Sequence, residues 1–419
     1  LVRGNDISAT GILVTSAGGG IGAKNHVKNA IIEYNYVHNC PSGIKINAYD
    51  NTTFSGPENA TIRYNIVTGT TGSYAPGLYI FTIKDPSVII YGNLIFQNNG
   101  PGVRFDNTVT GDVDVKLYNN IFYKNGLSGG SGEIYINNFT ANSTNIEIKN
   151  NIFYTRGVGY SWAALYEFGG KTLTHSNNIY YNPSTATNAQ LANLNGTIYY
   201  KSQFPLITAW EPSVYATDPN FTNTSNLPTG FTGTYGINLQ PNNDGLSVES
   251  GDAIDKGVNL GIAYNNAINL AGRSGGLTRP QGAGWDIGAY EQAATYYVST
   301  TGSDSNPGIQ SQPWATLSYA CGRVTTPGST IHINAGTYTD ISYCQLAVGV
   351  SIEGAGKATT TINCSVGDPI NSAYISMYSV SQADGSNSIH DFSLDGGNST
   401  TIMGIDSRNR HNQTVYNMN

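Results

Sequence analysis

Between residues 34 and 180, one short pattern of polar and apolar positions recurs at nearly constant spacing. An Asn is followed by two apolar residues and preceded by Tyr, Gly or Asn. The copies are Tyr34-Asn35-Tyr36-Val37, Tyr64-Asn65-Ile66-Val67, Gly92-Asn93-Leu94-Ile95, Asn119-Asn120-Ile121-Phe122, Asn150-Asn151-Ile152-Phe153 and Asn177-Asn178-Ile179-Tyr180. Successive copies lie 27 to 31 residues apart, and a period of this size is typical of a solenoid.

A second pattern, Gly followed by alternating residues, lies between these copies. It occurs at Gly11-Ile12-Leu13-Val14, Gly43-Ile44-Lys45-Ile46, Gly77-Leu78-Tyr79-Ile80, Gly102-Val103-Arg104-Phe105 and Gly132-Glu133-Ile134-Tyr135. Alternation with period two predicts a strand. The residues expected to point inward are Ile12, Val14, Ile44, Ile46, Leu78, Ile80, Val103 and Phe105. Each repeat therefore predicts at least two short strands joined by Gly and Asn turns.

Such strands become stable by stacking on equivalent strands of neighbouring repeats, about 4.8 Å apart, and this predicts an all-β parallel β-helix. Asn at a fixed turn fits this fold, because Asn tolerates a left-handed backbone and stacked amides bond coil to coil. The alternative, an antiparallel sandwich, would need hairpin turns every 8 to 12 residues and no long period.

Residues 295 to 356 resemble the opening of right-handed parallel β-helix proteins of the pectate-lyase-like superfamily. The matching stretches run from Thr295 to Gly308, from Pro313 to Leu317 and from Ile331 to Tyr338. The resemblance implies a first strand, a short capping helix near 313–322 and a first coil. Residues 251 to 291 resemble the family's irregular closing segment, which is found in surface-anchored bacterial proteins.

Because the opening motif follows the closing motif, we expect a circularly permuted order, 293–419 and then 1–292. The expected parts are the C-terminal half of the coils at 1–185, an irregular closing segment at 186–292, and a cap with the N-terminal half of the coils at 293–419. Tyr416-Asn417-Met418-Asn419 joined to Leu1-Val2-Arg3-Gly4-Asn5 would rebuild one Asn unit, neither half being complete alone. The start at Leu1 favours a processed or excised piece.

The permuted order allows two arrangements. Either residues 186–292 run back along the flank of the helix, or the opening cap starts a new helix beyond the closing segment. The second would let residues 293–419 of one copy continue into residues 1–292 of the next, giving a head-to-tail filament or array. The motifs slightly favour this second arrangement.

Composition narrows the class of protein. Only 11% of residues are charged and the net charge is -7 with a pI near 5.3, which argues against a nucleic-acid binder. No apolar run is long enough to span a membrane. Cys321 and Cys344 flank one predicted strand, so they form either a disulfide or a pair of buried thiols.

Ten Asn-X-Ser/Thr sequons, together with the low charge, favour an extracellular or cell-surface glycoprotein. They begin at Asn51, Asn59, Asn138, Asn142, Asn195, Asn220, Asn223, Asn363, Asn398 and Asn412.

The outward positions of the Gly-led strands form the candidate site. In coil order we expect the pairs Asp406 and Arg408, Leu13 and Thr15, Lys45 and Asn47, Tyr79 and Phe81, Arg104 and Asp106, and Tyr135 and Asn137. Aromatic rings stack on sugars and cations neutralise uronate carboxylates, so this column is a candidate polysaccharide groove, with Asn47, Phe81, Asp106 and Tyr135 as binding residues. The alternative is an ordinary solvated face. The charged stretch Asp406 to His411 is interpreted as a turn.

If the chain is an enzyme, the candidate catalytic residues are Lys45, Tyr79 and Arg104. One of them would take the proton beside a uronate carboxylate, and another, or calcium held by Asp106, would stabilise the developing charge. No metal site or other cofactor is otherwise indicated.

Two functions follow from the sequence. The first is a non-catalytic structural or surface protein whose partners are copies of itself, end to end. The second is a secreted polysaccharide lyase, or less specifically a glycoside hydrolase, acting on acidic polysaccharide, with a carbohydrate-binding adhesin between the two.

Overall fold

A computed structural model of the chain divides into two compact units, Leu1–Gln292 and Ala293–Asn419, which are described separately. The residues it describes are 1–8, 19–24, 27–47, 59–81, 87–106, 113–128, 132–137, 144–157, 164–167, 173–186, 188–206, 211–236, 239–248, 250–269, 279–282, 284–325, 328–370, 372–384, 387–397 and 403–419.

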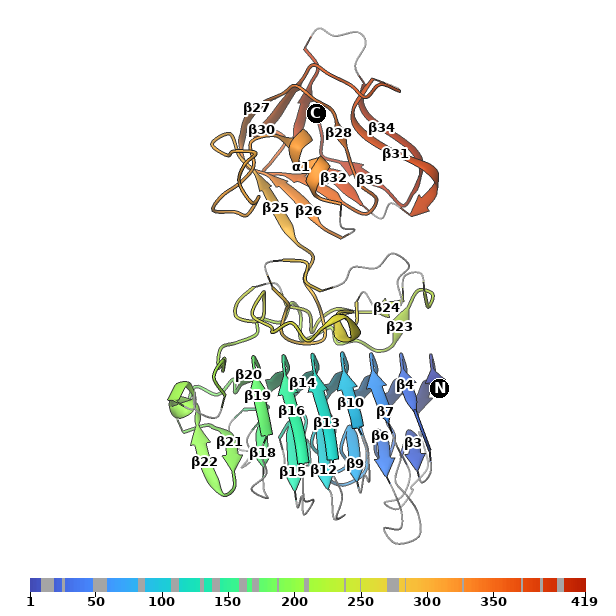
Figure 1. Ribbon diagram of the computed structural model, residues 1–419, viewed down its shortest axis with the longest axis vertical. Helices are drawn as coiled ribbons and strands as arrows, with labels where there is room; N and C mark the ends of the chain where they lie inside the picture. The colour runs from blue at the N-terminus through green and yellow to red at the C-terminus, as the bar shows by residue number, and fades with distance from the viewer. Residues whose placement is uncertain are drawn as a thin grey trace. The chain divides into compact units, whose positions relative to one another are not determined.

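The first unit is a parallel β-helix with three strands in each coil (Figure 1). Equivalent strands of successive coils pair in parallel and form three sheets, which we name A, B and C in chain order. Sheet A contains β1 (Val2–Arg3), β4 (Ile31–Glu33), β7 (Ala60–Arg63), β10 (Ser87–Tyr91), β13 (Val113–Tyr118), β16 (Thr144–Lys149) and β19 (Leu173–Ser176). Sheet B contains β2 (Asp6–Ser8), β5 (Tyr36–His38), β8 (Ile66–Thr68), β11 (Leu94–Phe96), β14 (Ile121–Tyr123), β17 (Ile152–Tyr154) and β20 (Ile179–Tyr181).

Sheet C contains β3 (Ile21–Lys24), β6 (Ile44–Asn47), β9 (Leu78–Phe81), β12 (Val103–Asp106), β15 (Ile134–Asn137), β18 (Leu165–Glu167) and β21 (Gln190–Leu194). An antiparallel strand, β22 (Thr197–Tyr200), pairs with β21 at its edge. The inward residues predicted in β6, β9 and β12 are all buried. The parallel β-helix prediction is confirmed, whereas Ile12 and Val14 lie outside the described residues.

A ladder of stacked asparagines supports the turn between sheets A and B. The residue before each Asn has a positive φ, as at Tyr34 (54°) and Asn119 (52°). Each Asn Nδ2 donates to the Oδ1 of the Asn one coil later, at 2.8 to 3.0 Å. The rungs are Asn5, Asn35, Asn65, Asn93, Asn120, Asn151 and Asn178. The amides thus satisfy buried polar groups that would otherwise destabilise the turn.

Two asparagine ladders in the described part of this unit each end on a buried glutamate. Asn178 donates its backbone N–H and its amide to Glu211 Oε1, at 2.8 and 3.0 Å. A shorter ladder at the next turn passes from Asn98 to Asn125 and ends on Glu133 Oε2, at 2.6 Å. A carboxyl group accepts hydrogen bonds through its oxygens, so it can terminate a chain of donors.

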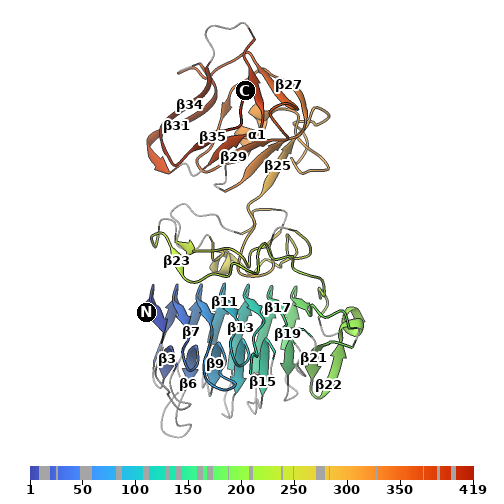
Figure 2. The same cartoon turned by 180° about the vertical axis from the view of Figure 1, so that it is seen from behind.

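The irregular segment after β22 covers the outward side of sheet B. It contains η1 (Lys201–Leu206), β23 (Phe231–Thr232), β24 (Gln240–Pro241) and η2 (Ile262–Tyr264). Phe221 packs edge-on against Tyr123, while Tyr235 packs against Tyr34 near the first coil. The segment then returns, and Asn177 donates to the carbonyl of Lys256. The described residues between 211 and 291 therefore lie along the outward side of sheet B (Figure 2). Which of the two predicted arrangements applies stays open.

The structure corrects two details at the start of the chain. Residues Leu1–Ser8 supply β1, a turn and β2, and Asn5 lies in ladder register with Asn35, so this half of the junction is complete alone. The strand that pairs with β6 is β3, with Gly22 opposite Lys45, rather than the expected strand at 11–14. Of the two segments that begin with a glycine, at 11–14 and at 20–23, the second is the one that pairs with β6. The permuted order itself stays a prediction.

The second unit is a shorter parallel β-helix with the equivalent sheets A′, B′ and C′. Sheet A′ contains β25 (Thr295–Val298), β26 (Thr330–Ile333), β29 (Ser351–Gly354), β32 (Ser388–His390) and β35 (Thr414–Tyr416). Sheet B′ contains β27 (Gly336–Asp340), β30 (Thr360–Cys364) and β33 (Ser393–Asp395), and sheet C′ contains β28 (Cys344–Gln345), β31 (Ala373–Asp384) and β34 (Met403–His411). The stretch from Asp406 to His411 is therefore strand, not a turn.

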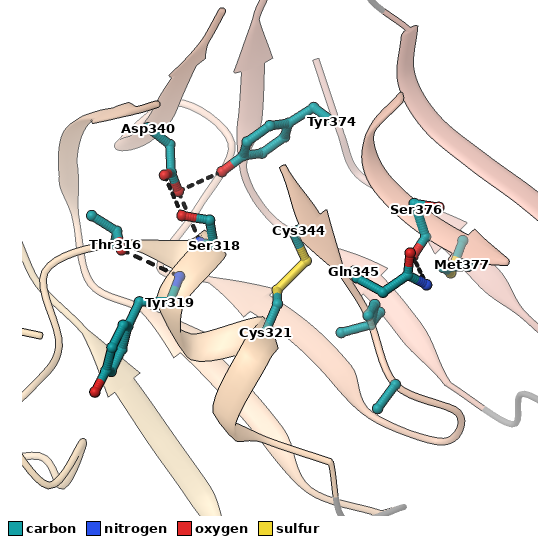
Figure 3. The surroundings of a disulfide bond; sticks show 12 residues. Thr316, Ser318, Tyr319, Cys321, Asp340, Cys344, Gln345, Tyr374, Ser376 and Met377 are labelled. Atoms are coloured by element: carbon teal, nitrogen blue, oxygen red, sulfur yellow. Dashed lines mark hydrogen bonds between the residues drawn. A yellow bond between two sulfur atoms is a disulfide. The ribbon is translucent and has the colours of Figure 1, made fainter. Parts of the chain in front are cut away.

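The helix α1 (Leu317–Arg323) caps the first coil of this unit, close to the predicted 313–322. Thr316 accepts a hydrogen bond from Tyr319 N at the helix start, and Leu317, Ala320 and Cys321 are buried. Cys321 forms a disulfide with Cys344 of β28 (Figure 3). Buried Asp340 holds the helix to the coil, because it accepts from Ser318 N at 2.9 Å and from the Tyr374 hydroxyl at 2.7 Å.

Candidate functional site

The outward face of sheet C brings most of the candidate residues together. Lys45, Tyr79, Arg104 and Tyr135 are directly opposite one another on consecutive strands. Phe81 and Asp106 form a second row two residues further along their strands. We call these two rows the sheet C column. Asn47 is in register with Phe81, but its side chain lies outside the described residues, as do Leu13 and Thr15.

Arg104 is the centre of the column. Its Nε donates to Asp106 Oδ2 at 2.5 Å, and the Tyr79 hydroxyl donates to the same oxygen at 3.2 Å. The guanidinium carbon lies 5.7 Å from the Tyr79 ring centre and 5.2 Å from that of Tyr135. The arginine is thus held by one carboxylate and two aromatic rings, while its side chain keeps 34% exposure.

The tyrosine rings of the column stack on one another. Tyr135 and Tyr166 have ring centres 4.7 Å apart and planes inclined by only 5°. One face of the Tyr135 ring contacts Tyr166, and the Arg104 guanidinium carbon lies 5.2 Å from its centre, so Tyr135 offers mainly its hydroxyl and ring edge to a ligand. For Tyr135, hydrogen bonding of a sugar to the phenol is therefore more favourable than stacking of the sugar on the ring.

The environment tunes the titratable groups differently. Burial, and then the Asp106 charge, raise the pKa of Tyr79 to about 12, so this phenol remains a hydrogen-bond donor near neutral pH. Burial, and then the Lys24 charge, lower the pKa of Lys45. Within the described part of the chain no ion pair involves Lys45, and its aliphatic stem passes beside Gly19. Both effects disfavour the charged form of Lys45.

The residues present do not fit calcium at Asp106. One of its oxygens already accepts from Arg104 and Tyr79, and calcium requires six to eight oxygen ligands. No group of three or more His, Cys, Asp or Glu side chains suited to a metal occurs among the described residues.

Three residues belong to the column that the sequence analysis did not select. Tyr166 of β18 is opposite Tyr135, Asn193 of β21 is opposite Tyr166, and Lys24 of β3 is opposite Asn47. The alternation Leu165-Tyr166-Glu167 was a usable signal for Tyr166, although no glycine precedes it.

The sequons fall into two groups. Asn51, Asn138, Asn142 and Asn398 lie outside the described residues. Asn59, Asn195, Asn220, Asn223 and Asn412 are exposed, and Asn363 is half-buried in β30. Attached glycans remain a prediction. No described helix has the length and apolar character that crossing a membrane requires.

Comparison with known proteins does not assign the chain to a family. No family model matches the chain, and no curated protein matches it. A structural match was found to a mutant of the PL6 family alginate lyase AlyGC, with 15% sequence identity and a TM-score of 0.30. The match covers 99% of this chain, which spans about half, 53%, of that protein.

Proposed function

We propose that this chain is an extracellular protein that binds acidic polysaccharide through the sheet C column. The observation that carries the proposal is the in-register row of Lys45, Tyr79, Arg104, Tyr135 and Tyr166 on one outward face. The resemblance of residues 295 to 356 to the pectate-lyase-like superfamily supports the same class of ligand.

The spacing of charge in the column suits a polymer with regularly placed carboxylates. Lys45 and Arg104 are two strands apart, about 10 Å. Arg104 uses its Nε for Asp106, which leaves terminal N–H groups of the guanidinium for a carboxylate of the ligand. The phenols between and beside these cations add donors and acceptors for sugar hydroxyls.

The test is calorimetry with oligogalacturonate as the acidic ligand and a neutral dextran oligosaccharide as the comparison. Losing one charge-assisted hydrogen bond of about 1.5 to 3 kcal/mol predicts that Arg104→Ala weakens binding about tenfold or more. Arg104→Lys keeps the charge and should lose less. The control is Lys116→Ala, which removes a lysine from the outward side of sheet A. Equal binding by Arg104→Ala and Lys116→Ala would rule out the column.

A second candidate function, a polysaccharide lyase, is favoured by the lowered pKa of Lys45. In this reaction the Lys45 amine takes the proton beside the uronate carboxylate, and the electron pair forms a C=C bond as the neighbouring glycosidic C–O bond breaks. Tyr79, which stays protonated, donates a proton to the leaving oxygen, and Arg104 neutralises the carboxylate. The unsaturated product absorbs ultraviolet light, and unchanged turnover by Lys45→Gln would eliminate this assignment.

End-to-end assembly into a filament also stays a prediction from the order of the motifs. Negative-stain electron microscopy across a concentration series tests it. Single particles at every concentration would contradict it.

A further inference from the structure

The second unit carries a group of side chains with the same chemistry as the centre of the sheet C column. It consists of Tyr378 on β31 and of Asp406 and Arg408 on β34, which lie side by side in sheet C′ (Figure 1). Tyr378 is directly opposite Arg408, just as Tyr79 is directly opposite Arg104. Both groups therefore occupy the third sheet of their coils, with the tyrosine one coil before the arginine.

The contacts correspond closely. Arg408 Nε donates to Asp406 Oδ2 at 2.9 Å, and the equivalent bond from Arg104 to Asp106 is 2.5 Å. The Arg408 guanidinium lies 5.0 Å from the Tyr378 ring centre, against 5.7 Å for Arg104 over Tyr79.

Exposure of the charged groups also agrees. The arginine side chains are 37% and 34% exposed, and their aspartates 12% and 10%. One difference is the order along the strand: Asp406 precedes its arginine by two residues, whereas Asp106 follows its own by two.

Arg408 still has hydrogen-bonding capacity for a ligand. Its Nη2 is buried and has no hydrogen-bond partner among the described residues. That atom is closed to solvent, so a ligand has to use the exposed part of the guanidinium: the Arg408 side chain is 37% exposed, and its bond to Asp406 is made through Nε. The neighbouring Arg410 is different, because it donates to the carbonyls of Leu346 and Tyr378 and therefore holds the strands together.

We propose that Tyr378, Asp406 and Arg408 form a second site for carboxylate groups of acidic polysaccharide, so that one chain has two such sites. The inference rests on the proposed function of the sheet C column and extends it to the second unit. Two sites on one polypeptide engage a long polymer more tightly than either engages a short oligomer, because the second contact becomes intramolecular.

The test is calorimetry on the full chain with trigalacturonate as the probe. Unmodified protein should bind two molecules per chain, and Arg104→Ala and Arg408→Ala should each bind one. Arg408→Lys, with circular dichroism to confirm folding, keeps the charge and should bind the second molecule more weakly. Arg323→Ala is the matched control, since Arg323 also lies over a tyrosine, 5.1 Å from the Tyr319 ring centre, but pairs with no aspartate among the described residues. It should leave both sites intact.

The outcomes separate the two proposals. One molecule bound per chain, lost in Arg104→Ala and retained in Arg408→Ala, would overturn the second site and leave the proposed function standing. No binding by the unmodified chain would overturn both.

Discussion

The asparagine ladder makes a quantitative prediction about stability, which is best tested at its middle rung. In Asn120→Ala, Asn93 loses the acceptor of its backbone N–H and of its amide, at 3.0 and 2.9 Å. The Asn120 amide no longer bonds Ile90 O, Tyr118 O and Asn151 Oδ1. The Asn93 amide, Tyr118 O and Asn151 Oδ1 keep other partners, so the main losses are those of the Asn93 N–H and of Ile90 O. At about 1 to 3 kcal/mol for each group, we expect a loss of about 2 to 6 kcal/mol in the free energy of unfolding.

A loss of that size is a large part of the stability of an ordinary domain, about 5 to 15 kcal/mol. The assay is urea denaturation followed by circular dichroism, with hydrogen exchange to locate the weakened coils. Asn145→Ala is the matched control: Asn145 is exposed and makes an inter-strand bond to Asp114 at 3.0 Å, so its removal should change stability by less than about 0.5 kcal/mol. Asn5→Ala, at the exposed end of the ladder, should fall between the two. If Asn120→Ala and Asn145→Ala destabilise equally, the ladder does not stabilise the coils.

Two further predictions follow, one for the first unit and one for the second. Burial raises the pKa of Glu133 from 4.5 to about 8, so the folded state holds this proton more tightly than the unfolded state does. The stability that this proton contributes below pH about 4.5 should therefore fall by about 1.4 kcal/mol per pH unit as pH rises toward about 8. Glu133→Gln should flatten this dependence in denaturation curves, and an unchanged slope would contradict the assignment. Reducing the Cys321–Cys344 disulfide, which joins residues 23 apart, should lower the stability of the second unit by about 3 kcal/mol. Calorimetric scans with and without reductant check this, and the transition of the first unit, whose Cys40 is unbridged, is the internal control.

The coil could be predicted from the sequence because the residues that repeat have definite physical roles in it. Asn35, Asn65 and their equivalents mark a turn that needs a left-handed residue before it, and the apolar alternation of the Gly-led strands marks the core. The strands of sheet A were not separately predicted. They lie immediately before the Asn units, so one apolar stretch contains two strands and the turn between them.

Other features depend on contacts that no local pattern encodes. Glu211 ends the long ladder from a segment without the Asn register, so its role arises only when the coil places it next to Asn178. The strand paired with β6 was predicted at 11–14, where the apolar alternation is stronger, whereas β3 contains Gly22 and has a weaker strand pattern. The expected order of Lys45, Tyr79, Arg104 and Tyr135 agrees with the strand pairing, whereas Leu13 was expected beside Lys45 and Gly22 lies there. The stacking of Tyr135 on Tyr166 depends on the pairing of β15 with β18.

The segment over sheet B restricts the number of coils that the first unit can contain. Its contacts reach from Tyr34 near one end to Asn177 near the other. A solenoid without such a strap could gain or lose whole repeats by duplication and stay in register. Here an inserted repeat would move the contacts at Tyr34 and Asn177 apart by one more strand spacing, so the segment would have to lengthen with it. We therefore expect the number of repeats to vary together with the length of this segment.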